Sequence, residues 1–181
     1  ANPAKFSAVT ASLADTTAAT VSASSAATAG SYAVEVQTLA QAHKLKSGTF
    51  ATTATTVGSG TLTIQFGTYS GGVFTLNPDK AAGTITIDSS KSSLAGVRDA
   101  INAANIGVSA SIVNDGTGNR LVVASKDSGV ANALKITVAD DDLANTDNSG
   151  LSQLVHDAAT GGTTNLTQTV AAQNAALVID G

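Results

Sequence analysis

The sequence of 181 residues contains no cysteine, methionine or tryptophan, and it is poor in aromatic side chains. Without cysteine, a disulfide framework, thiol chemistry and a thiolate metal site are all excluded. Aromatic residues make up 3% of the chain, so the hydrophobic 43% must build its cores from Ala, Val, Leu and Ile. We therefore expect thin layers that pack closely, without large side chains between them.

Charged residues are also scarce, at 12% of the chain, about half the usual share of roughly 25%. The formal net charge is -4, and Lys and Arg do not cluster in the way that nucleic acid or an anionic membrane surface attracts. Neither is expected as a partner. No run approaches the roughly 18 apolar residues of a membrane-spanning helix, and no signal peptide opens the chain. Because the first residue is not methionine, we expect an excised fragment of a longer protein.

Alternation of apolar and polar residues predicts several β-strands before residue 90. They are expected within residues 6–23, 32–39, 62–66, 73–76 and 83–87. Gly71-Gly72 predicts a hairpin turn between the third and the fourth of these segments. Residues 47–60, rich in Thr, Ala, Ser and Gly, predict a connector between domains, with Phe50 and Val57 as its only large apolar residues.

A helix is predicted to begin at Leu94, because Ser92 or Ser93 can accept a hydrogen bond from its first amides. Leu94, Val97, Ile101 and Ala104 form one apolar stripe of this helix. Burial of its three large side chains would stabilise the fold by roughly 5 to 8 kcal/mol, as an upper estimate.

Strands follow this helix, and together with it they form a module at residues 92–138. Gly96 predicts close approach of a neighbouring strand, and Gly107 suits the left-handed residue that ends a helix. Three further strands are expected at residues 108–112, 121–123 and 134–138, the first two joined by the turn-forming residues Asn114 to Gly118. A strand, a helix and three antiparallel strands predict an α+β unit whose helix covers one sheet face.

For the whole chain we expect an α+β fold, mostly antiparallel β with one or two short helices. It should form two small β-rich domains, the second inserted in the first. The inserted domain is expected at residues 58–142, and the discontinuous domain at residues 1–57 plus 143–181. The strand at residues 174–181 (NAALVIDG) has no local partner, which places it beside the N-terminal strands.

The sequence predicts no catalytic, cofactor-binding or metal-ligating residues, and hence no enzyme. His43 and His156 lack metal-ligand spacing and are expected at the surface or at a boundary. Asp140, Asp141 and Asp142 are consecutive, which indicates a solvated turn, with a weak cation site as the alternative. No Gly-x-Ser-x-Gly nucleophile elbow occurs.

Other residues allow both a structural and a functional interpretation. No Gly-Lys-Ser or Gly-Lys-Thr follows the paired glycines near residues 58–60 and 71–72, so these glycines predict turns and not a phosphate loop. The triplet Asn165-Leu166-Thr167 matches a glycosylation acceptor but occurs readily by chance. Two groups are expected in the core, with a partner-binding surface as the alternative: Leu151, Leu154, Val155 and Ala158 on a short helix, and the aromatic residues Phe50, Tyr69 and Phe74.

The module at residues 92–138, with its helix end INAANIGVSAS, closely resembles a segment repeated in bacterial flagellar hook-associated proteins. Residues 32–46 (YAVEVQTLAQAHKLK) and 174–181 resemble the segments that flank this module in the filament cap proteins of that family. These stretches cover most of the chain in the family's order. No long heptad pattern occurs, so the family's coiled-coil segments are missing and the chain resembles the outer head region.

The resemblance implies a secreted structural subunit of the bacterial flagellum, located outside the cell at the filament tip, which promotes flagellin polymerisation. It implies flagellin and other cap subunits as partners, in a homo-oligomer, and no cofactor. The alternative is an adhesin that recognises host glycans or mucin through the exposed head. Contact surfaces are expected on turns, such as residues 70–72 and 114–119.

Overall fold

The computed structural model describes residues 9–17 and 19–181. The chain forms two compact units, one made of Ala1–Thr38 with Ala176–Gly181 and the other of Leu39–Ala175, which we call the terminal and the central unit. These divisions differ from the boundaries that the sequence suggested near residues 57 and 142. The difference arises because residues 39–57 and 143–175 pair and pack with the module.

The described part of the terminal unit contains a two-stranded antiparallel sheet. Strand β1 (Val34–Thr38) pairs with β10 (Ala176–Ile179), with Val34 opposite Ile179. The predicted pairing of the C-terminal strand with an N-terminal one is therefore confirmed. The strands expected within residues 6–23 are wrong for residues 9–17 and 19–23, which form none, while residues 6–8 lie outside the described part. Their Ala, Ser and Thr side chains bury too little apolar area to offset the entropy of ordering a strand.

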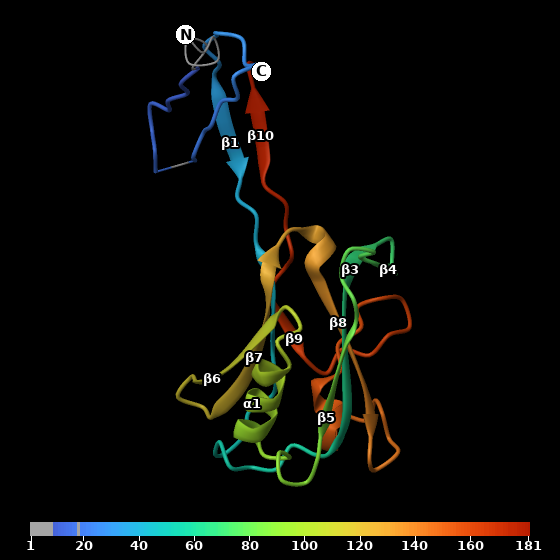
Figure 1. Ribbon diagram of the computed structural model, residues 1–181. Coiled ribbons are helices and arrows are strands. Elements are labelled where there is room, and N and C mark those ends of the chain that lie inside the picture. The colour runs from blue at the N-terminus through green and yellow to red at the C-terminus, as the bar shows by residue number, and fades with distance from the viewer. Residues whose placement is uncertain (1–8, 18) are drawn as a thin grey trace, which may run out of the picture. The chain divides into compact units, whose positions relative to one another are not determined.

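The first sheet of the central unit has four antiparallel strands in the order β6-β7-β2-β9 (Figure 1). They are β6 (Val108–Asn114), β7 (Asn119–Ser128), β2 (Ala42–Lys46) and β9 (Thr167–Val170). Strands β6 and β7 form the predicted hairpin, with Asn114 opposite Asn119 at its turn. Strand β2 places Leu45 in the core and Lys44 on the solvent face, as the period of two requires.

The second sheet is built around the long strand β3 (Gly60–Ser70). Strand β8 (Ala133–Asp140) pairs along one edge of β3. Strands β4 (Val73–Leu76) and β5 (Gly83–Ile87) follow one another along the opposite edge. The β3–β4 hairpin and the strand at β5 confirm the sequence predictions for this region.

Helix α1 (Leu94–Ala104) begins where the sequence predicted. The side chain of Ser93 accepts a hydrogen bond from the Gly96 amide at 3.1 Å, which decides between the two possible caps. Leu94, Val97 and Ile101 are buried, so the predicted apolar stripe is confirmed. The residue that ends the helix in the left-handed conformation is Asn105 and not Gly107, because the helix stops one turn short of that glycine.

The strands of the module do not all share one sheet, which corrects the expected α+β unit. Strands β6 and β7 belong to the first sheet, whereas β8 crosses to the second and pairs with β3 over residues 133–140. Helix α1 joins β5 of the second sheet to β6 of the first and contacts both (Figure 1). Its apolar stripe therefore enters a core shared by the two sheets, and does not cover one face of a single sheet.

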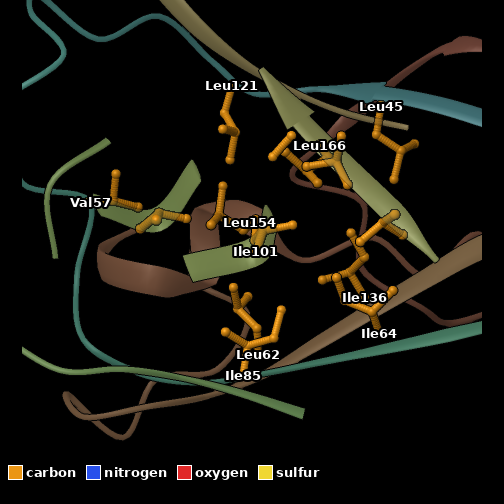
Figure 2. Close-up of a cluster of buried hydrophobic side chains, with 14 of the residues drawn as sticks. Leu45, Val57, Leu62, Ile64, Ile85, Ile101, Leu121, Ile136, Leu154 and Leu166 are labelled. Atoms are coloured by element: carbon orange, nitrogen blue, oxygen red, sulfur yellow. The ribbon is translucent and has the colours of Figure 1, made fainter. Parts of the chain in front are cut away.

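This core is continuous through the central unit, and Figure 2 shows its aliphatic side chains converging from both sheets and from α1. Two short 3-10 helices complete the unit, η2 (Val130–Asn132) and η3 (Gly150–Leu154). From η3 and the residue after it, Leu151, Leu154 and Val155 are buried, while Ala158 is exposed. The core-packing interpretation of that segment is thus confirmed for the first three residues. None of the described helices has both the length and the apolar character that a bilayer crossing requires.

Two residues of the segment 47–60 belong to this core, so its interpretation as an interdomain connector is wrong. Phe50 and Val57 are buried. The backbone of Phe50 exchanges two hydrogen bonds with Asn119, at 2.8 and 2.9 Å, and the Val57 amide donates to the Ser92 carbonyl at 2.7 Å. The core position expected for Phe50 is confirmed, and long-range backbone bonds that the composition does not show hold the segment in place.

Gly96 is required by a close approach, but the neighbour is not a strand. A Cβ atom at this position would lie 2.5 Å from the carbonyl oxygen of Lys91. The segment that leads into α1 folds back across its first turn, and only a residue without a side chain fits between them.

Candidate functional site

The two histidines lie together inside the central unit. His43 in β2 and His156 after η3 are 1% and 3% exposed, and their ring centroids are 5.6 Å apart. The expectation that both lie at the surface or at a boundary is therefore wrong. A sequence signal was present for His43, because Leu45 lies two residues further on and shares its face in a strand, whereas no local signal marked His156.

His43 connects three strands through its two ring nitrogens. Its Nδ1 accepts a hydrogen bond from the Leu134 amide of β8 at 2.9 Å, and its Nε2 lies 2.8 Å from Oε1 of Gln168 in β9. An amide can only donate, so Nδ1 carries no proton and Nε2 donates to the glutamine oxygen. The ring is thus a neutral tautomer fixed by both neighbours.

His156 holds the edge of β8 against the segment that leads into β9. Its backbone exchanges two hydrogen bonds with Ile136, at 2.8 and 2.9 Å. Its Nδ1 lies 3.2 Å from the carbonyl oxygen of Leu166, which can only accept, so Nδ1 carries the proton. The buried Nε2 has no hydrogen-bond partner in the structure. The ring is again neutral.

The surroundings disfavour the charged form of both rings. Burial lowers the pKa of His43, against the opposing effect of its hydrogen bond to Gln168. Burial also lowers the pKa of His156; the Leu166 carbonyl and the Asp157 carboxylate oppose this, and the neighbouring His43 adds to it. Among the described residues, no third metal ligand lies beside the two histidines, and there is no cluster of His, Cys, Asp or Glu that could hold a metal ion.

Tyr69 and Phe74 meet across the β3–β4 hairpin, with ring centroids 4.7 Å apart. Both are half-buried, and the Phe74 ring lies over Gly67, where a Cβ atom would be 2.7 Å from the ring. Burial raises the pKa of Tyr69 to about 12. Asn77 does not join them, because its side-chain amide donates to the Ala131 carbonyl at 3.1 Å.

The three consecutive aspartates form a turn with distinct roles. Asp140 is buried and its carboxylate accepts hydrogen bonds from the amides of Ser152, at 2.8 Å, and Asp142, at 3.4 Å. Asp142 in turn accepts from the Ala144 amide at 2.8 Å, and Asp141 is exposed. The carboxylate of Asp140 therefore closes η3 onto the end of β8, which is a structural role.

The asparagine of the glycosylation triplet is engaged internally. The Asn165 amide nitrogen donates to the Ser152 carbonyl at 2.8 Å, and the residue is only partly exposed. Attachment of a glycan would have to break this bond.

One open groove of about 610 Å³ lies between β5 and α1. Thr84 and Thr86 line it from the strand, and Gly96, Ala100 and Ala103 line it from the helix. Ser90, Lys91 and Asp99 also line it. The Ser90 hydroxyl donates to Asp88, Lys91 is ion-paired with Asp88, and Asp99 accepts from Arg98, so these side chains bond residues outside the lining.

Two protein-family models match the chain. The model described as "Flagellar hook-associated protein 2 N-terminus" matches residues 1–43, and the one described as "Flagellin hook IN motif" matches residues 68–127. The second match spans α1 and the β6–β7 hairpin.

The chain is also similar to flagellar hook-associated protein 2 of Escherichia coli strain K12, with 39% identity over 175 residues. That alignment covers 94% of this chain and 34% of the relative, so the chain spans about a third of the relative's length.

Among solved structures, the D2-D3 domains of the flagellar cap protein FliD from Escherichia coli superpose with a TM-score of 0.72 at 39% identity. The superposition covers 88% of this chain and 75% of that one. The D2-D3 domains of the cap protein from Serratia marcescens superpose with a TM-score of 0.69 at 30% identity, covering 86% of this chain and 77% of that one.

Proposed function

This chain belongs to the flagellar hook-associated protein 2 family, and we propose that it forms the outer part of a filament cap. In this role it sits outside the cell at the filament tip and promotes the polymerisation of flagellin. Its partners are flagellin and other cap subunits. The observation that carries the proposal is the match to FliD D2-D3 domains over 88% of the chain at 39% identity.

The chemistry of the described residues fits a subunit that binds and does not catalyse. The buried side chains of Asp140 and His43 bond within the fold, and the groove residues Ser90 and Asp99 bond Asp88 and Arg98. Few charges and many small polar side chains favour exchangeable contacts over a permanent apolar interface.

Of the two turns expected as contact surfaces, the β3–β4 hairpin offers apolar side chains. Val73 and Leu76 of β4 are 62% and 55% exposed, next to the turn at residues 70–72. The turn at residues 114–119 is polar and closed on itself, because Asp115 accepts from Arg120 at 2.6 Å. We therefore assign protein contacts of the cap to the β4 hairpin first.

The adhesin alternative gains no support. A glycan site would need exposed aromatic and carboxamide groups around one hollow. Tyr69 and Phe74 pack against each other and onto Gly67, and the Asn77 amide is bonded elsewhere.

The test uses the full-length protein in a strain that lacks its own cap gene. Val73→Asp with Leu76→Asp should leave secretion of the cap intact but release unpolymerised flagellin into the medium and shorten filaments. Thr84→Asp with Thr86→Asp, on the exposed positions of β5, is the matched control and should restore filaments. Failure of the unaltered protein to restore any filament would sink the cap assignment. Normal filaments with the β4 variant would sink only the hairpin contact.

A further inference from the structure

We propose that His43 and His156 form a proton-sensitive latch between the two sheets of the central unit, closed at neutral pH and opened by acid. The inference does not depend on the cap function. It rests on the position of both rings at the seam between the sheets and on the hydrogen bonds that each ring makes.

Each histidine ties the second sheet to the first. His43 projects from β2 of the first sheet and accepts the Leu134 amide of β8 in the second, at 2.9 Å. His156 is bridged by its backbone to Ile136 of β8, and its ring bonds the Leu166 carbonyl just before β9 of the first sheet. The two rings thus span the same seam side by side.

Protonation is incompatible with this arrangement. A proton on Nδ1 of His43 would point a second donor at the Leu134 amide and remove the acceptor that this buried amide needs. A proton on Nε2 of His156 would create a buried donor without an acceptor, because that nitrogen has no partner. Two charged rings with centroids 5.6 Å apart would also repel each other. The closed seam therefore holds both rings neutral.

The charged groups around the pair are already engaged with other partners. Asp157, next to His156, is ion-paired with Lys135 of β8 at 2.7 Å, which limits its support for a charged ring. Tyr69 of β3 faces His156 edge-on at 6.4 Å between centroids, and its raised pKa keeps its hydroxyl neutral. In β9 the neighbour of His43 is the uncharged Gln168.

The strands beside His43 add no carboxylate that could compensate its charge. Lys44 of β2 is exposed. The residue that shares the inward face of β2 with His43 is the apolar Leu45. The register of β2 and β7 is irregular beside His43, between Ala42 and Lys44. The charged side chains of β7 in that stretch have other partners: Lys126 donates to Asn105, and Asp127 accepts from Lys80.

Acid must then open the seam by linkage. Burial holds the pKa of both histidines below the usual value of 6.5, so the open form binds more protons than the closed form once the pH falls below about 6.5. The stability of the seam is fully present above that pH and is lost below it. The equilibrium constant for opening the seam should rise by up to about tenfold for each unit that the pH falls. This factor applies to each histidine that is neutral in the closed seam and protonated in the open one.

The structure supplies a matched internal control for the measurement. The Leu134 amide donates to His43, and the Leu121 amide donates to the hydroxyl of Ser47; both bonds are buried and both measure 2.9 Å. Only the first acceptor titrates. Hydrogen exchange of these two amides in the 181-residue chain, compared at pH 7.5 and pH 5.0, isolates the latch from general acid destabilisation.

We expect the protection factor of Leu134 to fall at least tenfold more than that of Leu121 over this interval. In the double variant His43→Gln with His156→Gln, the glutamine oxygen can still accept the Leu134 amide but does not titrate, so both amides should change in parallel. Equal changes in the unaltered chain, or an unchanged Leu134 response in the double variant, would overturn the proposal.

Nitrogen NMR of the imidazole rings tests the latch without any substitution. We expect His43 to remain the neutral Nε2–H tautomer for as long as the Leu134 amide is protected. A ring that titrates near pH 6.5 while that amide stays protected would refute the latch, even if the double variant failed to fold.

Discussion

Asn102 of α1 and Ala110 of β6 are joined by a reciprocal pair of hydrogen bonds. The Asn102 amide nitrogen donates to the Ala110 carbonyl at 2.8 Å, and its Oδ1 accepts from the Ala110 amide at 2.8 Å. The side chain thereby occupies the place that a neighbouring strand would take beside β6. The side chain therefore bonds the free amide and carbonyl of Ala110 at the outer edge of the first sheet, and it fixes α1 against that edge.

We expect Asn102→Ala to lower the free energy of unfolding by about 1 kcal/mol. The loss of two hydrogen bonds, roughly 1 to 3 kcal/mol, is partly offset by the better helix propensity of alanine. Urea unfolding at neutral pH measures the change. Ser109→Ala, at an exposed position of the same strand, is the control and should stay within about 0.5 kcal/mol. Equal midpoints for the two variants would contradict the role given to Asn102.

The cap of α1 gives a second stability test. Ser93→Ala removes the acceptor for the Gly96 amide and should destabilise the chain by about 1 kcal/mol. Ser92→Ala is the matched control, because the Ser92 hydroxyl bonds only the Ser89 carbonyl on the exposed side. Thermal unfolding of both variants should separate them, and a larger loss at Ser92 would show that the helix begins differently in solution.

Local features of this fold could be predicted from the sequence, because their causes lie within a few residues. The alternation in β3, a serine cap at residue 92 or 93, the apolar stripe of α1 and the turn at residues 114–118 each follow from neighbours in the chain. The boundaries of the two units, the sheet that receives β8 and the strand that Phe50 pairs with depend on long-range pairing instead. The backbone of Phe50 bonds that of Asn119, and β8 pairs with β3. No local sequence pattern predicts either partner.

The histidine pair shows the same limit at the level of side chains. His43 and Leu134 are 91 positions apart, and Gln168 is 125 positions from His43. Residue spacing could exclude a metal motif but could not show that both rings are buried in one seam. No strand was predicted at residues 42–46, so the period of two that puts His43 on the buried face with Leu45 was not applied.

Tyr69 provides a prediction at high pH. Burial raises its pKa to about 12, above the usual value of 10.0, so the folded state retains this proton more tightly than the unfolded state. The associated stability is present below pH 10 and is lost as the pH rises towards 12. The ultraviolet titration of the unaltered chain minus that of Tyr69→Phe isolates the Tyr69 phenolate, which should appear only near pH 12. Ionisation of Tyr69 by pH 10.5 would contradict the buried environment of its ring.

The most severe single change is expected at Ile101, which α1 places in the core between the two sheets. Ile101→Asn leaves an unpaired amide there and removes apolar contacts with both sheets, so it should cost about 3 kcal/mol or more. Ala103→Asn introduces the same side chain on the exposed face of the same helix and should cost less than about 1 kcal/mol, through helix propensity alone. Urea unfolding of the two variants compares the free energy lost when the same asparagine is placed at a buried and at an exposed position of α1. Similar losses at the two positions would mean that α1 does not present Ile101 to the core, and would remove the helix from its place between the sheets.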